Sequence, residues 1–219
     1  MNRFTNIYEI VANSWERNPT NTAIRDLNGK EVNYKTLLSK VDDYVEKLSD
    51  AGIIEGDRIA LILPKTIDTV ALILATLKLN AVYVPIDFES PETRQLDVLY
   101  DCTPKLVVVE STRESIANYK SYSNEDSFTF LLAKSTKKLH SNTHKNSAFI
   151  LFTSGSTGSP KGVVHTHQSA LHFINWSSEA FLPNESDVFA SHAPFHFDLS
   201  IFDIRYFCKL KAWSYFVTH

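Results

Sequence analysis

Short apolar runs alternate with longer amphipathic stretches along most of this chain. The apolar runs cover residues 58–63, 82–86, 105–109 and 148–152. They are continuous and end at turn residues, which is typical of strands buried on both faces of a sheet. In 7–15, 37–48, 66–79 and 168–181, apolar residues recur every three or four positions, as on one face of a helix. Strands that alternate with helices predict an α/β fold with a helix-covered, mostly parallel sheet.

Local signals refine this pattern. Asn28-Gly29 between two short β-prone runs predicts a hairpin. Pro91 is expected to begin a helix that runs to Tyr100, with Ser90 as its N-cap. Residues 111–146 are polar, with a single apolar run at 128–133, and we expect a surface excursion that contains one strand.

The segment between two of the predicted strands is rich in hydroxyl groups and glycine. It reads Thr153-Ser154-Gly155-Ser156-Thr157-Gly158-Ser159-Pro160-Lys161-Gly162 and connects run 148–152 to a second β-prone run at 162–165. Glycine lets backbone N–H groups approach an anion closely, and a lysine adds positive charge. The segment therefore predicts a loop that binds the phosphates of a nucleotide.

Other interpretations of this loop were weighed. A Walker A motif ends in Gly-Lys-Ser/Thr and leads into a helix, whereas Pro-Lys-Gly and a β-prone run occur here. A nucleophile elbow needs a Gly-x-Ser-x-Gly frame, which is missing. A mobile Ser/Gly-rich linker remains the alternative.

A second candidate is Asp198, which lies among aromatic residues in 193–198. A carboxylate in apolar surroundings is costly unless a cation or hydrogen bonds compensate it. The ammonium group of a substrate would be a suitable partner. The alternative is a helix N-cap, with Asp198 beginning a helix through Asp203. On the preceding helix, 168–181, we expect Phe173 and Trp176 to be core residues, and a second role behind the substrate pocket is the alternative.

Composition argues against nucleic-acid binding, metal binding and a membrane span. The 219 residues are 43% hydrophobic, enough for one sizeable core, and the net charge of −3 gives no electrostatic footprint for nucleic acid. Cys102 and Cys208 lack metal spacing and are expected to be reduced thiols of a cytoplasmic protein. No histidine pair has a metal-binding frame. No apolar run approaches the ~18 residues of a membrane span, so we expect no membrane partner.

Three segments resemble the adenylate-forming enzymes, which include acyl-CoA synthetases, luciferases and nonribosomal adenylation domains. The loop 153–162 resembles their phosphate-binding loop. Residues 77–87 resemble their upstream core motif, with Asn80 in place of a usual glycine or alanine. Phe197-Asp198-Leu199-Ser200 resembles the Phe-Asp-x-Ser motif of the amino-acid-activating branch. The resemblance covers residues 8–204 and implies an incomplete N-terminal portion of the family's fold.

The resemblance implies ATP-dependent adenylation of an amino acid, followed by transfer to the phosphopantetheine thiol of a carrier protein. Within that branch, 193–204 looks most like D-alanine–carrier-protein ligases. Asp198 would hold the substrate's α-amino group. The residues that would contact the ATP phosphates are Thr153, Ser154, Gly155, Ser156, Thr157, Gly158 and Lys161.

The resemblance also implies what the chain is expected to lack. In relatives, the adenine contacts, the Mg²⁺ ligand and a C-terminal domain with the adenylation lysine follow later, so no catalytic residue is assigned. Residues 205–219 are expected to be an aberrant tail, which a single-base frameshift near 203–205 would explain. We expect the chain alone to be inactive. Two alternatives stay open: an acyl-CoA synthetase fragment, which Asp198 disfavours, and a non-catalytic remnant or ATP-binding interaction module.

Overall fold

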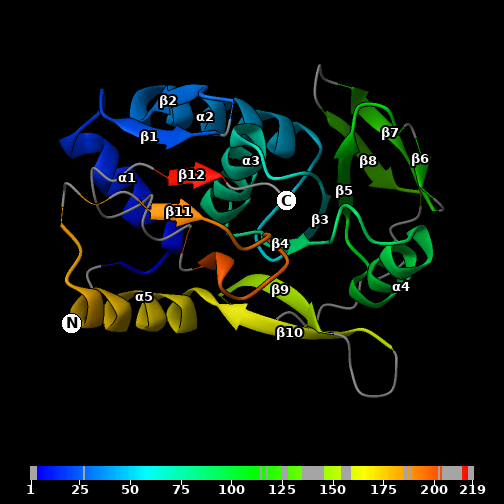
Figure 1. Ribbon diagram of the computed structural model, residues 1–219. Helices are drawn as coiled ribbons and strands as arrows, with labels where there is room; N and C mark the ends of the chain where they lie inside the picture. The colour runs from blue at the N-terminus through cyan, green and yellow to red at the C-terminus, as the bar shows by residue number, and fades with distance from the viewer. Residues whose placement is uncertain are drawn as a thin grey trace.

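Helices and strands alternate over residues 34–110, as the sequence pattern predicts, and the described elements from there to residue 166 are all strands (Figure 1). The computed structural model describes residues 4–26, 28–113, 115–116, 118–124, 128–134, 146–153, 159–184, 187, 189–201, 203 and 214–216. Its helices are α1 (Ile7–Arg17), α2 (Tyr34–Asp50), α3 (Ile67–Lys78), α4 (Glu92–Cys102) and α5 (His167–Phe181). Its strands are β1 (Thr22–Arg25), β2 (Glu31–Asn33), β3 (Arg58–Ile62), β4 (Val82–Pro85), β5 (Leu106–Glu110), β6 (Ser115–Ile116), β7 (Tyr119–Asn124), β8 (Phe128–Ala133), β9 (Ser147–Thr153), β10 (Lys161–Thr166), β11 (Phe189–Ser191) and β12 (Ser214–Phe216).

The larger sheet has a parallel centre. Among the described residues its strand order is β10-β9-β4-β3-β5-β8-β7-β6. The pairs β9–β4, β4–β3 and β3–β5 are parallel. Both flanks are antiparallel, β10 on one side and β8-β7-β6 on the other. The predicted α/β class with a mostly parallel sheet is thus confirmed in the centre, and the antiparallel pairs lie toward the edges.

Helices cover both faces of the parallel centre, as expected. In β3, Ile59 and Leu61 belong to a core cluster with residues of α1, α2, α3 and α5. The alternate residues Ala60 and Ile62 belong to a second cluster, which includes residues of α4. Strand residues point alternately to opposite faces, so an unbroken apolar run is what burial on both faces requires.

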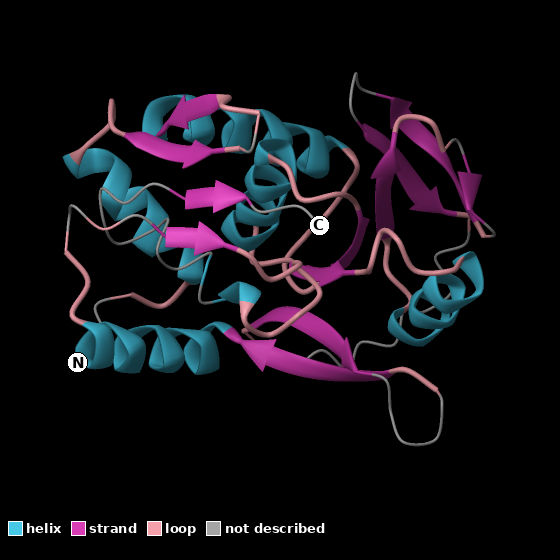
Figure 2. Cartoon of the chain, viewed as in Figure 1, coloured by secondary structure: helices cyan, strands magenta, loops and turns pink. Residues whose placement is uncertain are grey.

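A smaller sheet lies beside α1 and α2 (Figure 2). Its strand order in the described part of the chain is β11-β12-β1-β2. Strands β1 and β2 pair in antiparallel fashion next to Gly29, whose φ of 80° requires the glycine, so the predicted hairpin is confirmed. Strand β12 belongs to the segment expected to be an aberrant tail, and it pairs in parallel with both β1 and β11.

Two local expectations were wrong. Residues 111–146 contain three described strands rather than one, because β8 pairs with β7, and β7 with β6. Partner strands, more than its own polar sequence, determine that β7 is a strand. Ser90 does not cap α4: its hydroxyl donates to the carbonyl of Asp87, at 2.9 Å, and Pro91 occupies the N-cap position without a side-chain hydrogen bond.

Candidate functional site

The carboxyl ends of β3, β4 and β9 lie at the same edge of the larger sheet, because these strands are parallel. Polar residues follow or end each of them: Lys65 after β3, Asp87 after β4, and Thr153 as the last residue of β9. In open α/β sheets, this edge is where ligands usually bind. The candidate site is therefore built from strand ends and the connections that follow them.

A cavity of about 620 Å³ opens at this edge. It is lined by residues of the β4–α4 connection, α4, β9, β10 and the segment 196–198. Both Thr153 and Asp198 contribute to its wall, although they are far apart in the sequence. The volume is within the range of small-molecule sites in proteins.

One end of the predicted phosphate loop, Thr153, lines this cavity, and the other end is its neighbour on the adjacent strand. Lys161 begins β10 and is directly opposite Thr153 in the β9–β10 ladder. Directly opposed residues share one face of an antiparallel pair. Val163 and His165, two and four positions after Lys161, share that face and line the cavity. The remaining predicted loop residues, Ser154, Gly155, Ser156, Thr157 and Gly158, lie outside the described residues.

Gly162 follows Lys161 for a packing reason. A Cβ atom at this position would lie 3.0 Å from Cγ2 of Ile150 and 3.0 Å from Cζ of Phe152. A side chain at residue 162 would therefore press on Ile150 and Phe152, and both would have to shift by a few tenths of an ångström. This glycine of the motif serves the hairpin that carries the loop.

Asp198 lies on the surface, and the expected apolar burial of its carboxylate was wrong. Its neighbours Phe197 and Leu199 are exposed as well, so the aromatic character of the segment does not enclose it. Its Oδ1 accepts a hydrogen bond from the N–H of Leu199 at 2.9 Å. The N–H of Ile201 donates to its carbonyl, and Ser200, Ile201 and Asp203 are helical. Asp198 thus begins a helical turn at the rim of the cavity.

Two histidines contribute imidazoles to the cavity wall. His165 stacks on Phe149 with ring centroids 4.7 Å apart. Burial lowers the pKa of His165, and the negative charge of Asp198 opposes this. His196 lies 4.0 Å from Asp87, and burial likewise lowers its pKa against the opposing effect of Asp87. Lowered pKa values keep both rings neutral at pH 7, so they serve as polar walls rather than as cations.

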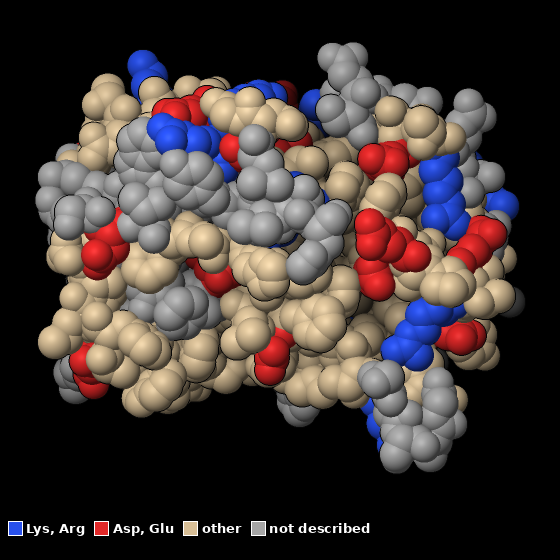
Figure 3. Space-filling model, in the orientation of Figure 1, with Lys and Arg blue, Asp and Glu red and all other residues tan. Residues whose placement is uncertain are grey.

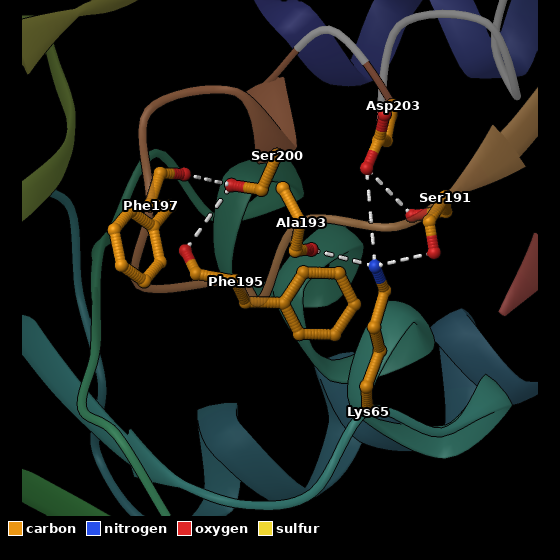
Figure 4. A network of polar contacts seen from close by, with 7 residues as sticks. All are labelled: Lys65, Ser191, Ala193, Phe195, Phe197, Ser200 and Asp203. Carbon is orange, nitrogen blue, oxygen red and sulfur yellow. Dashed lines mark hydrogen bonds and ion pairs between the residues drawn. The ribbon is translucent and has the colours of Figure 1, made fainter. Parts of the chain in front are cut away.

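A second cavity of about 340 Å³ adjoins the first and shares residues 85–87 and His196 with it. Its wall includes Lys65, which the sequence did not single out. The Lys65 ammonium donates to the carbonyls of Ser191 and Ala193, 2.9 and 2.6 Å away (Figure 4). Burial lowers the pKa of Lys65 to about 8, and the nearby Asp203 carboxylate opposes this.

Two cationic residues at the two cavities, Lys65 and Arg94, were not predicted from the sequence. The only sequence signal for Lys65 is a lysine directly after a buried strand and a proline, because its carbonyl partners lie 126 and 128 residues away. Arg94 is half-buried on α4 and lines the larger cavity. It belongs to an ordinary amphipathic helix, so its sequence context gives no hint of this place.

The aromatic residues of α5 are not core residues, which corrects the expectation for Phe173 and Trp176. Trp176 is 58% exposed, and Phe173 and Phe181 are exposed with it. Their rings contact one another, with centroids 5.9 Å apart for Phe173 and Trp176. Neither Phe173 nor Trp176 lines either of the two cavities.

The face shown in Figure 3 has mixed charge, and the described residues contain no candidate metal centre. On the face shown in Figure 3, basic and acidic side chains are interspersed, and the surface over α5 at the lower left is largely uncharged. Within the described ranges, no group of three or more His, Cys, Asp or Glu side chains could hold a metal ion. No helix in that part of the chain is long and apolar enough to span a membrane.

Comparisons with known proteins agree with this geometry. The model of the AMP-binding enzyme family matches residues 11–211. The chain is 33% identical over 218 residues to an L-proline–[L-prolyl-carrier protein] ligase of Pseudomonas fluorescens, covering 94% of this chain and 43% of the relative. The chain thus spans less than half the length of that relative.

Solved structures show the same fold. An AMPPNP-bound form of the nonribosomal peptide synthetase FmoA3 superposes with a TM-score of 0.80 at 19% identity, over 97% of this chain and 23% of that one. VinN superposes with a TM-score of 0.78 at 19% identity, over 95% of this chain and 55% of that one. At such identities these likenesses show the fold alone. Together with the match over 11–211, they show that the chain belongs to the AMP-binding, adenylate-forming enzyme family.

Proposed function

We propose that this chain supplies the phosphate-binding and substrate-facing part of a ligase that activates an amino acid with ATP and passes it to a carrier protein. The observation that carries the proposal is the shared cavity of Thr153 and Asp198. One residue ends the strand that leads into the phosphate loop, and the other offers a carboxylate to an ammonium group. The 33% identity to a carrier-protein ligase for L-proline supports an amino acid as the substrate class.

The proposed reaction has two steps. The carboxylate of the amino acid attacks the α-phosphorus of ATP, which gives an aminoacyl-adenylate and releases pyrophosphate. The phosphopantetheine thiol of a carrier protein then attacks the acyl carbon, forming a thioester and releasing AMP. Such transfers depend mainly on holding the reactants in place and stabilising charge.

The chain's own residues have distinct parts in this proposal. Thr153 and Lys161 begin and end the phosphate loop, and the ammonium of Lys161 offsets the negative charge of the triphosphate. Arg94, which lines the same cavity as Thr153, adds positive charge. Asp198 accepts from the α-ammonium of the amino acid. Mg²⁺ is expected in this family, but the described residues contain no fitting group of ligands, so we derive no step through it.

Binding measurements on the purified chain test the phosphate site. ATP is titrated into the wild type, Lys161→Met and a control, Lys35→Met, which removes an exposed lysine on α2. A charge-assisted hydrogen bond contributes ~1.5–3 kcal/mol. We therefore expect Lys161→Met to weaken ATP binding by roughly 10- to 100-fold, and Lys35→Met to leave it unchanged. Equal affinities in all three proteins would contradict the phosphate role.

A second titration tests the substrate class. Amino acids and fatty acids are titrated in the presence of ATP into the wild type, Asp198→Asn and the control Asp101→Asn, which changes an exposed aspartate on α4. An amino acid should bind the wild type and the control, and bind Asp198→Asn at least tenfold more weakly. Binding of fatty acids alone would favour an acyl-CoA synthetase fragment. ATP binding without any carboxylic acid would favour a non-catalytic ATP-binding module.

A further inference from the structure

Lys65 joins the carboxyl edge of the parallel strands to the segment that carries Asp198. It lies in the connection between β3 and α3, and its side chain is 9% exposed. Its ammonium donates to the backbone carbonyls of Ser191 and Ala193, at 2.9 and 2.6 Å. The beginning of the segment 191–203 is thereby bonded to one buried cation (Figure 4).

The same cation also contacts the far end of that segment. Oδ2 of Asp203 lies 3.8 Å from the Lys65 ammonium. This carboxylate oxygen accepts a hydrogen bond from the hydroxyl of Ser191 at 2.8 Å. Both ends of the segment therefore meet at Lys65, which makes one side chain of the β3–α3 connection the point from which the segment is held.

Between these ends, the chain forms an internally bonded turn. The hydroxyl of Ser200 donates to the carbonyl of Phe197 at 2.6 Å and lies 3.2 Å from that of Phe195. The N–H of Ile201 donates to the carbonyl of Asp198. The Lys65 ammonium lies over the ring of Phe195, 5.3 Å from its centroid. The turn is bonded within itself, and its residues Phe195 and Ile201 pack in the main core. The contacts of Lys65 add polar anchors at its two ends.

We propose that Lys65 is a positioning residue, whose ammonium fixes the 195–201 turn against the strand edge and so sets where Asp198 meets the substrate. The inference has two halves: a positioning half, that Lys65 fixes the turn, and a substrate half, that the turn sets where Asp198 meets the substrate. The substrate half rests on the proposed function. The positioning half does not, since it follows from the contacts of Lys65 alone. Lys65 itself touches neither ATP nor the amino acid in this proposal.

The chain provides a closely matched control. The Lys105 ammonium also donates to a backbone carbonyl, that of Gly52, and pairs with the aspartate Asp57. It precedes β5 and so lies at the amino edge of the same parallel strands. Replacing Lys65 by methionine leaves two carbonyls and a carboxylate without their cation, and replacing Lys105 leaves one carbonyl and a carboxylate. Both changes are destabilising. Of these two lysines, Lys65 contacts the segment 191–203 that carries Asp198, and the contacts of Lys105 are with Gly52 and Asp57.

Amide hydrogen exchange decides the positioning half. It is measured on the wild type, Lys65→Met, Lys65→Arg and Lys105→Met. We expect Lys65→Met to lower protection of the Ser200 and Ile201 amides about tenfold relative to the amides of β9, the effect of losing charge-assisted bonds. Lys65→Arg, which keeps a cation, should recover most of it, and Lys105→Met should leave the turn unchanged. The positioning half is overturned if Lys65→Met leaves these two amides as protected as before, or if Lys105→Met exposes them equally.

Titration of ATP and of the twenty amino acids into the same proteins decides the substrate half. We expect Lys65→Met to weaken binding of the best amino acid about tenfold and to leave ATP affinity unchanged. Equal loss of both ligands would indicate general damage and overturn a selective role. If Lys65→Met does not fold, Asp203→Asn, which removes one anchor with little change of shape, replaces it. A wild type that binds ATP but no amino acid would refute the proposed function, while the exchange result would still stand or fall by itself.

Discussion

Asn80 shows how a departure from a family pattern is accommodated by a neighbouring side chain. It follows α3 in the left-handed region, with a φ of 53°, where asparagine is tolerated better than most residues. Its Oδ1 accepts from Nδ2 of Asn6 at 2.6 Å, and Asn6 also donates to the carbonyl of Leu77. The asparagine thus suits this left-handed conformation, and it fastens the segment before α1 to the end of α3.

Substitution of Asn80 tests this account. Asn80→Ala removes the hydrogen bond and leaves a side chain that disfavours positive φ, so we expect a loss of ~1–2 kcal/mol in the free energy of unfolding. Asn80→Gly loses the bond but relieves the conformation, and should cost less. Urea unfolding measures both. An alanine variant as stable as the wild type would contradict the explanation.

His167 should make the stability of the fold depend on pH. It is buried, and its Nδ1 accepts from the N–H of Ile7 at 3.3 Å. Burial lowers its pKa to about 4, with Glu9 opposing. The unfolded chain, with a histidine pKa of ~6.5, binds a proton first. Stability should therefore fall as the pH drops from about 6.5 and level off below about 4.

Asparagine at this position separates the titration from the hydrogen bond. The Oδ1 atom in His167→Asn can accept from the same N–H but does not titrate. Unfolding in urea between pH 6.5 and pH 5 should show a smaller loss of stability in His167→Asn than in the wild type. Parallel curves for the two proteins would show that His167 does not titrate as stated.

At the residue scale, candidate residues could be named from local motifs, but their surroundings could not be predicted. Thr153 and Lys161 could be named because the loop's composition and spacing are local. Lys65 could not, since the carbonyls that its ammonium contacts are more than a hundred residues away in the sequence. The burial argument for Asp198 failed because a run of aromatic residues does not reveal which of them point into solvent.

Among the elements, unbroken apolar runs were the most predictable and paired polar strands the least. Strands β3, β4, β5 and β9 were all expected, because burial on both faces requires a run that can be seen in the sequence. Strand β7 was not, since it is held by β8 on one side and β6 on the other. Strand β12 depends in the same way on its partners, β1 and β11.

Proline at residue 215 tests the pairing of β12. Tyr215 is aligned with Arg25 of β1 and with Ala190 of β11. A proline in an inner strand removes a ladder hydrogen bond and is poorly tolerated. We expect Tyr215→Pro to lower the free energy of unfolding by ~2–3 kcal/mol, measured by thermal or urea unfolding. The control Tyr215→Val keeps strand propensity and should cost much less; equal stability of the proline variant and the wild type would rule out an inner strand.

For the whole molecule, the alternation of helices and strands predicted the layered architecture, and surface details had to come from the structure. The aromatic residues of α5 have helical spacing, which predicted a buried face, yet three of them are exposed together. Periodicity identifies the apolar face of a helix but does not show what covers it. A contiguous exposed apolar surface of this kind favours association.

A charged residue on α5 should reduce that association. We expect Trp176→Glu to lower the fluorescence of a bound hydrophobic dye and to raise solubility, because it divides the aromatic cluster. Tyr100→Glu is the control: Tyr100 is 88% exposed on α4, so its loss removes similar apolar area elsewhere. Dye binding that falls equally in both variants would show that no cluster on α5 is responsible.

The place of β12 also has a consequence for synthesis on the ribosome. Strand β1 leaves the ribosome long before its parallel neighbour β12, which follows much later in the sequence. Pairing between residues so distant in sequence closes a long loop and is slow. Until Ser214–Phe216 has been synthesised, one edge of β1 has unpaired backbone N–H and C=O groups. Such an edge can pair with a strand of another chain. The smaller sheet therefore exposes nascent chains to misassembly, and a chaperone that binds extended segments would act on β1 in this interval.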